Sequence, residues 1–306
     1  MFLIVLLQLT LASSFIVSKF LLGFVPPFLL VGLRMTTGGV ILLLYTALFN
    51  RSAFYITKRN IIPLVSAALF GIYITNGFES WGLKYTVAAK AYFIYNLGPF
   101  FAALLGYLFF HEKMTRNKWI GLAIGFVGFI PLIYNDLRSD NILINTLPEL
   151  AILVAAGAMV LGIVAKKKLV VFQHYSMIMA NGLLLFFGGL ISVSTGLYTE
   201  TIAWGSILAT PSLYWLLPLN VTLTCLIAYN MYGILVTRYS VTFISFSEFL
   251  GIFLVAFLGW AFLGETISNA FWVAFVLVAI GMYVFYKEEL RQRTMQSLFD
   301  EVKRLK

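Results

Sequence analysis

Two charged side chains of this sequence stand well inside apolar stretches, where they could bind a small charged molecule. Arg34 carries a planar guanidinium that matches the geometry of a carboxylate, and Glu248 offers a negative charge to a cationic group. A charge at the centre of a bilayer costs about 2.5–3.5 kcal/mol on insertion scales, so each of these charges needs a partner or a water-filled cavity. An alternative interpretation pairs Arg34 with a glutamate, which would hold helices together without contacting a solute.

Amide, hydroxyl and aromatic side chains accompany these charges. Glu79 lies deeper in its apolar stretch than Lys84, and Asn76 stands one turn before Glu79 on the same helical face. This placement indicates a role in the binding site or in an outer gate. Aromatic faces beside charges of both signs suit a ligand with a flat ring and a zwitterionic end, although each aromatic side chain alone also suits packing. The candidate substrate-binding residues are Arg34, Asn76, Glu79, Tyr92, Tyr95, Asn96, Tyr229, Asn230, Ser247 and Glu248.

Several other polar residues are expected to be structural. Lysines at helix ends commonly extend to the membrane interface, which is our interpretation of Lys84. Glu112 and Glu265 follow similar phrases at the ends of apolar stretches, and their symmetric recurrence indicates a turn that the fold requires. Cys225 is expected to pack as a small apolar residue. With one cysteine and two distant histidines, we expect no metal site.

The elements that would position these residues are membrane-spanning helices. Hydrophobic residues make up 61% of the chain and charged residues 11%, with a mean hydropathy of +0.95, whereas soluble domains carry about 25% charged residues. A hydrocarbon core about 30 Å thick needs about 20 apolar residues per helix, and the alternating segments of a membrane β-barrel are absent. The sequence therefore predicts an all-α membrane protein with ten transmembrane helices. The apolar stretches cover residues 1–22, 27–49, 61–82, 88–110, 118–135, 148–165, 175–197, 213–236, 242–263 and 269–286.

The lysines and arginines predict how these helices are oriented. Most of the 21 basic residues fall on the connections of one side when the N-terminus is placed inside the cell, a bias that is typical of cytoplasmic loops. Both termini are therefore predicted to be cytoplasmic, and residues 287–306 are expected to form a cytoplasmic tail. This distribution also explains the net charge of +9, so we expect no nucleic-acid partner.

An internal repeat divides the chain into two halves. Residues 80–134 are similar to residues 234–287, and a shift of 153 positions places Glu112 on Glu265. Five helices in each half is an odd number, so the second half would enter the membrane from the opposite face. Such an inverted 5+5 repeat can exchange inward-open and outward-open states around a site near mid-depth. We expect a first repeat over residues 1–135 and a second over residues 148–286.

Glycine and proline residues indicate how the helices bend and pack. Gly121, Gly125 and Gly128 form a stripe of small residues that allows two helices to approach closely. Gly98–Pro99 should interrupt the fourth apolar stretch near mid-depth, because proline lacks the amide that would continue the helix. The freed carbonyl could then face a cavity.

The residues that carry a family resemblance are LKYTVAAKAYFIYNLGPFFAALLGYLFFHEKMT at 83–115, KWIGLAIGFVGFIPL at 118–132 and GWAFLGETIS at 259–268. With its ten expected spans, the chain resembles the EamA-type branch of the drug/metabolite transporter superfamily. The resemblance implies an α-helical transporter without a cofactor, whose central cavity is lined largely by helices 3, 4, 8 and 9. Lys90 departs from the family, which usually has a small or apolar residue there, and the second repeat lacks a proline matching Pro99.

These observations predict a multi-pass inner-membrane transporter, not an enzyme, that moves a small polar or zwitterionic metabolite by alternating access. S-adenosylmethionine fits the expected site, since it carries a carboxylate, cationic centres and adenine, and the resemblance includes members that transport it. The expected partners are the small-molecule substrate and the lipid bilayer, with the protein a monomer or a homodimer. If Glu248 binds a proton instead, a proton-coupled amino-acid or drug exporter is the alternative. A membrane scaffold or an intramembrane enzyme is less favoured, because no dense cluster of reactive residues is present.

Overall fold

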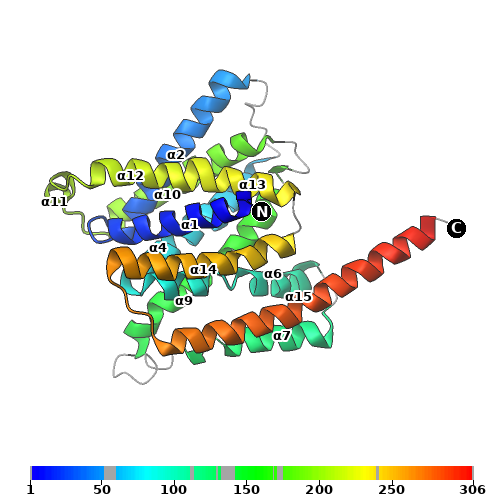
Figure 1. Cartoon of the computed structure of the whole chain (residues 1–306). Coiled ribbons are helices and arrows are strands. Elements are labelled where there is room, and N and C mark those ends of the chain that lie inside the picture. Colours follow the sequence, from blue (N-terminus) through cyan, green and yellow to red (C-terminus); the bar gives the residue numbers. More distant parts are fainter. Residues whose placement is uncertain are drawn as a thin grey trace. The chain divides into compact units, whose positions relative to one another are not determined.

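The chain is represented by a computed structural model (Figure 1). It describes residues 2–51, 60–110, 114–128, 130–131, 142–167, 169–170, 175–238 and 241–304. Within these ranges the ordered elements are helices, without a strand, so the expected all-α class is confirmed for the described part of the chain. Glu112 and both histidines, His111 and His174, lie outside the described residues.

The described part of the first half contains seven α-helices and one π-helix. They are α1 (Phe2–Leu21), α2 (Pro27–Phe49), α3 (Ile61–Ala68), the π-helix η3 (Leu69–Ile74), α4 (Thr75–Tyr85), α5 (Ala88–Tyr95), α6 (Gly98–Phe110) and α7 (Arg116–Val127). The second half has the same helical character. Its elements are α9 (Ile142–Lys167), α10 (Met177–Thr199), α11 (Trp204–Leu208), α12 (Leu213–Val221), the π-helix η5 (Thr222–Ala228), α13 (Tyr229–Arg238), α14 (Val241–Leu263) and α15 (Asn269–Arg304).

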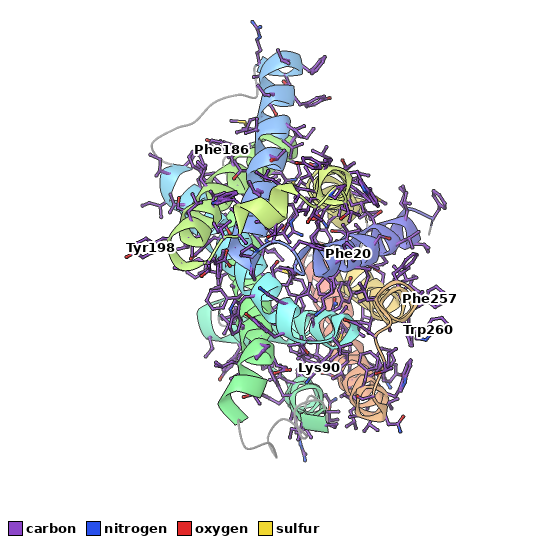
Figure 2. The ribbon with its side chains drawn as sticks, turned by 90° about the vertical axis from the view of Figure 1, so that its left-hand side faces the viewer. Phe20, Lys90, Phe186, Tyr198, Phe257 and Trp260 are labelled. Atoms are coloured by element: carbon purple, nitrogen blue, oxygen red, sulfur yellow. The ribbon has the colours of Figure 1, made fainter. Side chains whose placement is uncertain are left out.

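Among the described residues, seven helices are long and apolar enough to cross a membrane. Helices suit this environment because every backbone amide and carbonyl can be paired within the segment. Large aromatic side chains project outward from the apolar helices, as Tyr198 of α10 and Phe257 and Trp260 of α14 do in Figure 2. The candidate spans are Phe2–Leu21, Pro27–Phe49, Ile61–Tyr85, Thr146–Lys166, Met177–Thr199, Leu213–Leu235 and Asn269–Glu288.

Three of the apolar segments are not regular α-helices. The η3 and η5 segments insert π-helical turns directly before Thr75 and Tyr229, and such turns occur frequently at functional sites. The segment that begins at α5 is broken between α5 and α6, directly before Gly98–Pro99. The interruption expected at this proline is therefore confirmed.

The chain forms two compact units, and each combines segments from both halves of the sequence. The first unit contains residues 1–98 and 147–266, and the second contains residues 99–146 and 267–306. In the first unit, α2 lies against α10 with almost no space between the backbones. A Cβ atom at Gly32 would lie 2.5 Å from the Val193 backbone nitrogen, so only glycine fits there. In the same unit α1 packs along α14 (Figure 1).

In the second unit, α7 packs against α15. A Cβ atom at Gly121 would lie 2.7 Å from the carbonyl oxygen of Gly281, and one at Gly128 would lie 2.9 Å from the Leu277 side chain. Small residues allow two helices to approach this closely in a membrane. The close approach expected for the glycine stripe is confirmed, and its partner is α15.

Candidate functional site

Arg34 lies on α2 with its side chain almost fully buried, at 3% exposure. Its Nη1 atom donates hydrogen bonds to Ser18 Oγ at 2.7 Å and to Asn220 Oδ1 at 3.1 Å. Nη2 donates to Asn76 Oδ1 at 3.3 Å. Three helices far apart in the sequence, α1, α12 and α4, therefore hold one guanidinium in a fixed orientation.

The partners of Arg34 are themselves fixed. Asn220 is fully buried, and its Nδ2 donates to Ser14 O at 2.9 Å and to Ser18 Oγ at 3.0 Å. A further hydrogen bond joins the hydroxyls of Ser14 and Thr224. Because the amide nitrogen of Asn220 is occupied by these acceptors, its oxygen is left to face Arg34. Sequence analysis missed Ser18 and Asn220, although Asn220 is an amide inside an apolar stretch.

No carboxylate of the described residues lies within ion-pair distance of Arg34. Glu79, on α4, is close enough to interact with it electrostatically, and is buried at 8% exposure, but does not form an ion pair with it. The Nε atom of Arg34 is buried without a hydrogen-bond partner in this part of the chain. The alternative interpretation, an Arg34–glutamate pair that holds helices together, is therefore not what the described residues form.

Tyrosines and glutamates surround this position. The Tyr95 side chain lies near Glu79, Tyr229 and Glu248. Tyr229 also exchanges hydrogen bonds with Asn76, at 3.4 Å from the tyrosine hydroxyl to Oδ1 and at 3.3 Å from Nδ2 to the hydroxyl. The predicted residues that the structure brings together are Arg34, Asn76, Glu79, Tyr92, Tyr95, Tyr229 and Glu248.

The three remaining candidates, Asn96, Asn230 and Ser247, form hydrogen bonds with other side chains or with their own helix. Asn96 Nδ2 donates to the carbonyl of Tyr92, one turn earlier, at 2.7 Å. Asn230 Oδ1 accepts from Asn181 Nδ2 at 2.9 Å. These contacts assign structural partners to two predicted site residues.

Ser247, the third of these candidates, contacts Gln8, a residue that the sequence analysis did not identify. Its hydroxyl accepts a hydrogen bond from Gln8 Nε2 at 3.0 Å, and Gln8 is fully buried on α1. A Cβ atom at Gly251 would lie 2.6 Å from the Tyr92 hydroxyl and 2.8 Å from Gln8 Oε1. The missing side chain of Gly251 thus leaves the space that Tyr92 and Gln8 occupy beside the helix that carries Glu248.

Comparisons with known proteins agree with this architecture. Residues 1–134 match the EamA-like transporter family. An S-adenosylmethionine/S-adenosylhomocysteine transporter of Chlamydia muridarum is 29% identical over 92% of this chain and 89% of its own, and one of Chlamydia trachomatis is 29% identical over 92% and 87%. A probable amino-acid metabolite efflux pump of Salmonella typhimurium is 25% identical over 92% and 93%.

The family match over residues 1–134 and these relatives support an EamA-type transporter of the drug/metabolite transporter superfamily. The resemblance seen in the sequence is therefore confirmed, and the protein is a multi-pass membrane transporter. A solved crystal structure with 20% sequence identity has the same fold, with a TM-score of 0.62 over 92% of this chain and 93% of the other.

Polar residues near the helix ends are structural where their contacts are described. Lys84 is exposed, and its ammonium lies 5.8 Å from the centre of the Tyr85 ring. Glu265 Oε2 accepts a hydrogen bond from the Ala88 amide, at the first turn of α5, at 2.8 Å. Burial raises the pKa of Glu265, while this hydrogen bond and the charge of Lys19 oppose the rise. The contact with Ala88 agrees with the structural role expected for Glu265.

Proposed function

We propose that this EamA-type transporter carries S-adenosylmethionine and S-adenosylhomocysteine across the inner membrane by alternating access. The observation that carries the proposal is the buried Arg34, which has neutral hydrogen-bond partners and no carboxylate partner among the described residues. A buried charge without an opposite charge is costly. The α-carboxylate of an amino-acid-like substrate would supply the missing anion. The Chlamydia relatives named for these two solutes support the choice of substrate.

The surroundings of Arg34 suit the rest of such a molecule. Arg34 Nε has no partner in the described part and offers a donor to a carboxylate oxygen. Glu79 and Glu248 provide negative charges for the ammonium and sulfonium groups. Tyr92, Tyr95 and Tyr229 provide aromatic faces for the adenine ring, and a cation over such a face gains about 0.5–2 kcal/mol. One site thereby contains a group for each part of the ligand.

Alternating access requires two related halves, and several observations support the 5+5 inverted repeat. The π-helices η3 and η5 begin at Leu69 and Thr222, which are 153 positions apart, the same shift that aligns the two sequence repeats. The family match ends at residue 134, beside the boundary proposed for the first repeat at 135. With the charge distribution of the loops, we propose repeats over 1–135 and 148–286, ten spans, and both termini in the cytoplasm.

The proximity of equivalent residues supports the same symmetry. When two copies are related by a twofold axis, residues close to the axis contact their own equivalents. In the first unit, residues separated by 153 positions interact across α2 and α10, across α4 and α13, and across α5 and α14. These pairs are Thr36 with Gly189, Asn76 with Tyr229, and Tyr95 with Glu248. We propose that the axis passes through the candidate site.

Transport by purified protein in lipid vesicles tests the proposal. Vesicles loaded with unlabelled S-adenosylhomocysteine should take up labelled S-adenosylmethionine, and excess unlabelled S-adenosylmethionine should abolish the uptake. Methionine and adenosine, which each contain only part of the ligand, should compete weakly. Vesicles that exchange neither solute, although the protein is folded and correctly inserted, would disprove the substrate assignment.

A second candidate function is export of amino acids coupled to protons. It is favoured by the similarity to the Salmonella efflux pump and by Glu248, which is half-buried and has no described hydrogen-bond partner. The same vesicles distinguish the two functions, since an imposed proton gradient should drive the exporter and leave a simple exchanger unchanged. Glu248→Gln should abolish that dependence on the gradient if the exporter is correct.

A further inference from the structure

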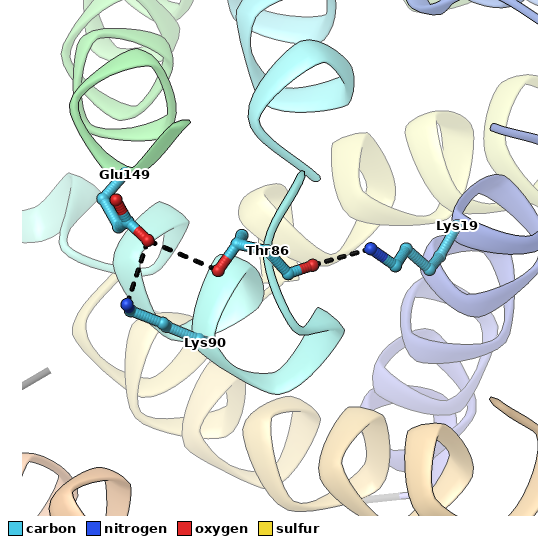
Figure 3. Close-up of polar contacts among 4 residues, drawn as sticks. All are labelled: Lys19, Thr86, Lys90 and Glu149. Carbon is cyan, nitrogen blue, oxygen red and sulfur yellow. Dashed lines mark hydrogen bonds and ion pairs between the residues drawn. The ribbon is translucent and has the colours of Figure 1, made fainter. Parts of the chain in front are cut away.

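A second group of charges lies where α4 ends and α5 begins, around the α4–α5 turn (Thr86–Val87). Lys90 Nζ, on the first turn of α5, lies 2.9 Å from Glu149 Oε1, near the start of α9 (Figure 3). The same carboxylate oxygen accepts a longer hydrogen bond from Thr86 Oγ1 at 3.5 Å. This ion pair joins an element of the first half of the chain to one of the second half.

The Lys90–Glu149 pair is shielded from its surroundings. The Lys90 side chain is 17% exposed and that of Glu149 is 4% exposed. The second carboxylate oxygen of Glu149 is buried without a described partner. Glu149 is therefore compensated mainly by the lysine, and removing one partner of a buried pair is far more costly than removing both.

Two further charges hold the α4–α5 turn from other directions. Lys19, in the last turn of α1, donates hydrogen bonds to the carbonyl of Leu83 at 2.6 Å and to that of Thr86 at 2.7 Å (Figure 3). Glu265, which follows α14, accepts from the Ala88 amide at 2.8 Å. Helix ends attract charges of these signs, a cation at the C-terminus of α4 and an anion at the N-terminus of α5.

The molecule is closely packed at this level. Leu83 and Ala88 are fully buried on either side of the turn. A Cβ atom at Gly82 would lie 2.5 Å from the Ile152 side chain of α9. Ser80 is buried one turn beyond Asn76 on the same face of α4, and therefore lies between the candidate site and the α4–α5 turn. Within the described part of the first unit, passage of a solute at this level would require α4 and α5 to move away from α9.

We propose that the Lys90–Glu149 ion pair is a latch that holds this end of the transporter closed, with Lys19 and Glu265 fixing the turn that carries it. The proposal rests on the proposed function only in assuming that the two halves rock against each other. Opening this end would separate α5 from α9, which the ion pair joins across the two halves. Loss of Lys90 would leave a buried, unpaired carboxylate on α9, and that carboxylate gains hydration only if the end opens.

Accessibility of a cysteine below the latch tests the proposal. We would replace Ser80 by cysteine in a Cys225→Ala background and measure its labelling by a membrane-impermeant maleimide, in intact cells and in inverted vesicles. Lys90→Gln and Glu149→Gln should each increase the labelling rate about tenfold, from one face of the membrane only. The exchanged variant, Lys90→Glu with Glu149→Lys, should restore slow labelling because the pair is re-formed.

The matched control is Lys84→Gln, at the same end of α4. The Lys84 side chain is exposed, and its one described contact is with the Tyr85 ring. The labelling rate of this variant should equal that of the wild type. If a single variant accumulates poorly, the double variant Lys90→Gln with Glu149→Gln removes the attraction without leaving a buried charge, and should still label faster than wild type.

If the folded single variants were labelled at the same rate as the wild type, the latch proposal would be overturned. An equal increase from both faces, which indicates a loosened fold, would overturn it as well. The labelling requires no substrate, so its outcome is independent of the vesicle transport assay. A protein that labels as expected yet carries no S-adenosylmethionine would disprove the proposed substrate and leave the latch standing.

Discussion

Two buried polar regions of the same unit differ in how their charges are balanced. Arg34 is held by one hydroxyl and two amides, and no carboxylate of the described residues pairs with it. At the α4–α5 turn, Lys90 contacts a carboxylate and Lys19 contacts helix-terminal carbonyls. In the first region, neutral hydrogen-bond partners orient one charge. In the second region, each lysine contacts a carboxylate or helix-terminal carbonyl groups.

This difference suits the region around Arg34 to binding a solute and the α4–α5 turn to holding the transporter closed. A guanidinium oriented by neutral groups keeps its positive charge available, so it attracts an anion that can enter and leave. A lysine already paired with a carboxylate has little affinity left for a solute, but its pair can join two helices and release them. On this basis the cargo would be recognised at Arg34 and the conformational state would be set at Glu149.

The largest effect should come from Arg34→Ala. A hydrogen bond to a charged group contributes about 1.5–3 kcal/mol, so affinity for S-adenosylmethionine should fall about 10- to 100-fold. The decarboxylated analogue lacks the group that Arg34 would bind, and its affinity should change much less. Calorimetric titration of purified protein measures both ligands.

Arg51→Ala is the matched control for this substitution, because Arg51 is exposed and donates only to the Ala47 carbonyl in the described part. It should bind both ligands as wild type does. An equal loss of affinity for the two ligands in Arg34→Ala would mean that Arg34 holds the helices and does not contact the carboxylate.

A smaller and more selective effect is expected for Glu248→Gln. S-adenosylmethionine has a positively charged sulfonium, and S-adenosylhomocysteine has a neutral thioether in its place. Loss of the carboxylate should weaken the first ligand about tenfold and the second by less than about twofold. Competition binding with both solutes measures the ratio directly. Glu288→Gln, on α15, serves as the control, and an unchanged ratio in Glu248→Gln would assign the sulfonium to another residue.

Much of this fold could be predicted because hydropathy and helix length respond to the same physical constraint, the thickness of the hydrocarbon core. The break before Gly98–Pro99 was also predictable, since proline removes an amide. The π-helical turns η3 and η5 were not, because they satisfy the same hydropathy as an α-helix and leave no mark in the composition.

The site could be predicted only where a charge was conspicuous. Arg34 and Glu248 are charges inside apolar stretches, so the sequence alone reveals them. Asn230 directly follows Tyr229 in the sequence, but successive helical residues point about 100° apart, and Asn230 contacts Asn181. Asn220 was missed because its contact with Arg34 spans 186 positions, which no local pattern records.

The α4–α5 turn should lose stability when Lys19 is replaced. Lys19→Gln removes a cation from the carbonyls that end α4, an interaction worth about 1 kcal/mol. The midpoint of thermal unfolding should fall by about 2–4 °C, with ligand affinity close to wild type. Lys84→Gln, at the exposed neighbouring position, should leave the midpoint unchanged. A loss of ligand affinity larger than the loss of stability would place Lys19 in the binding region and weaken the division between the two regions.

The smallest effect concerns the pH dependence at Glu265. Burial raises the pKa of its carboxyl above the ordinary value of 4.5, and the Ala88 amide and Lys19 reduce the rise. The folded chain then binds the proton more tightly than the unfolded chain, so stability falls as pH rises from the ordinary pKa through the raised one. Glu265→Gln retains an acceptor for the Ala88 amide and has no charge. The midpoint of thermal unfolding can be measured from about pH 4 to about pH 7, the range in which buried glutamates titrate. Over this range the wild type should lose stability relative to Glu265→Gln. Parallel curves would mean that the helix end and Lys19 balance the carboxylate of Glu265 fully.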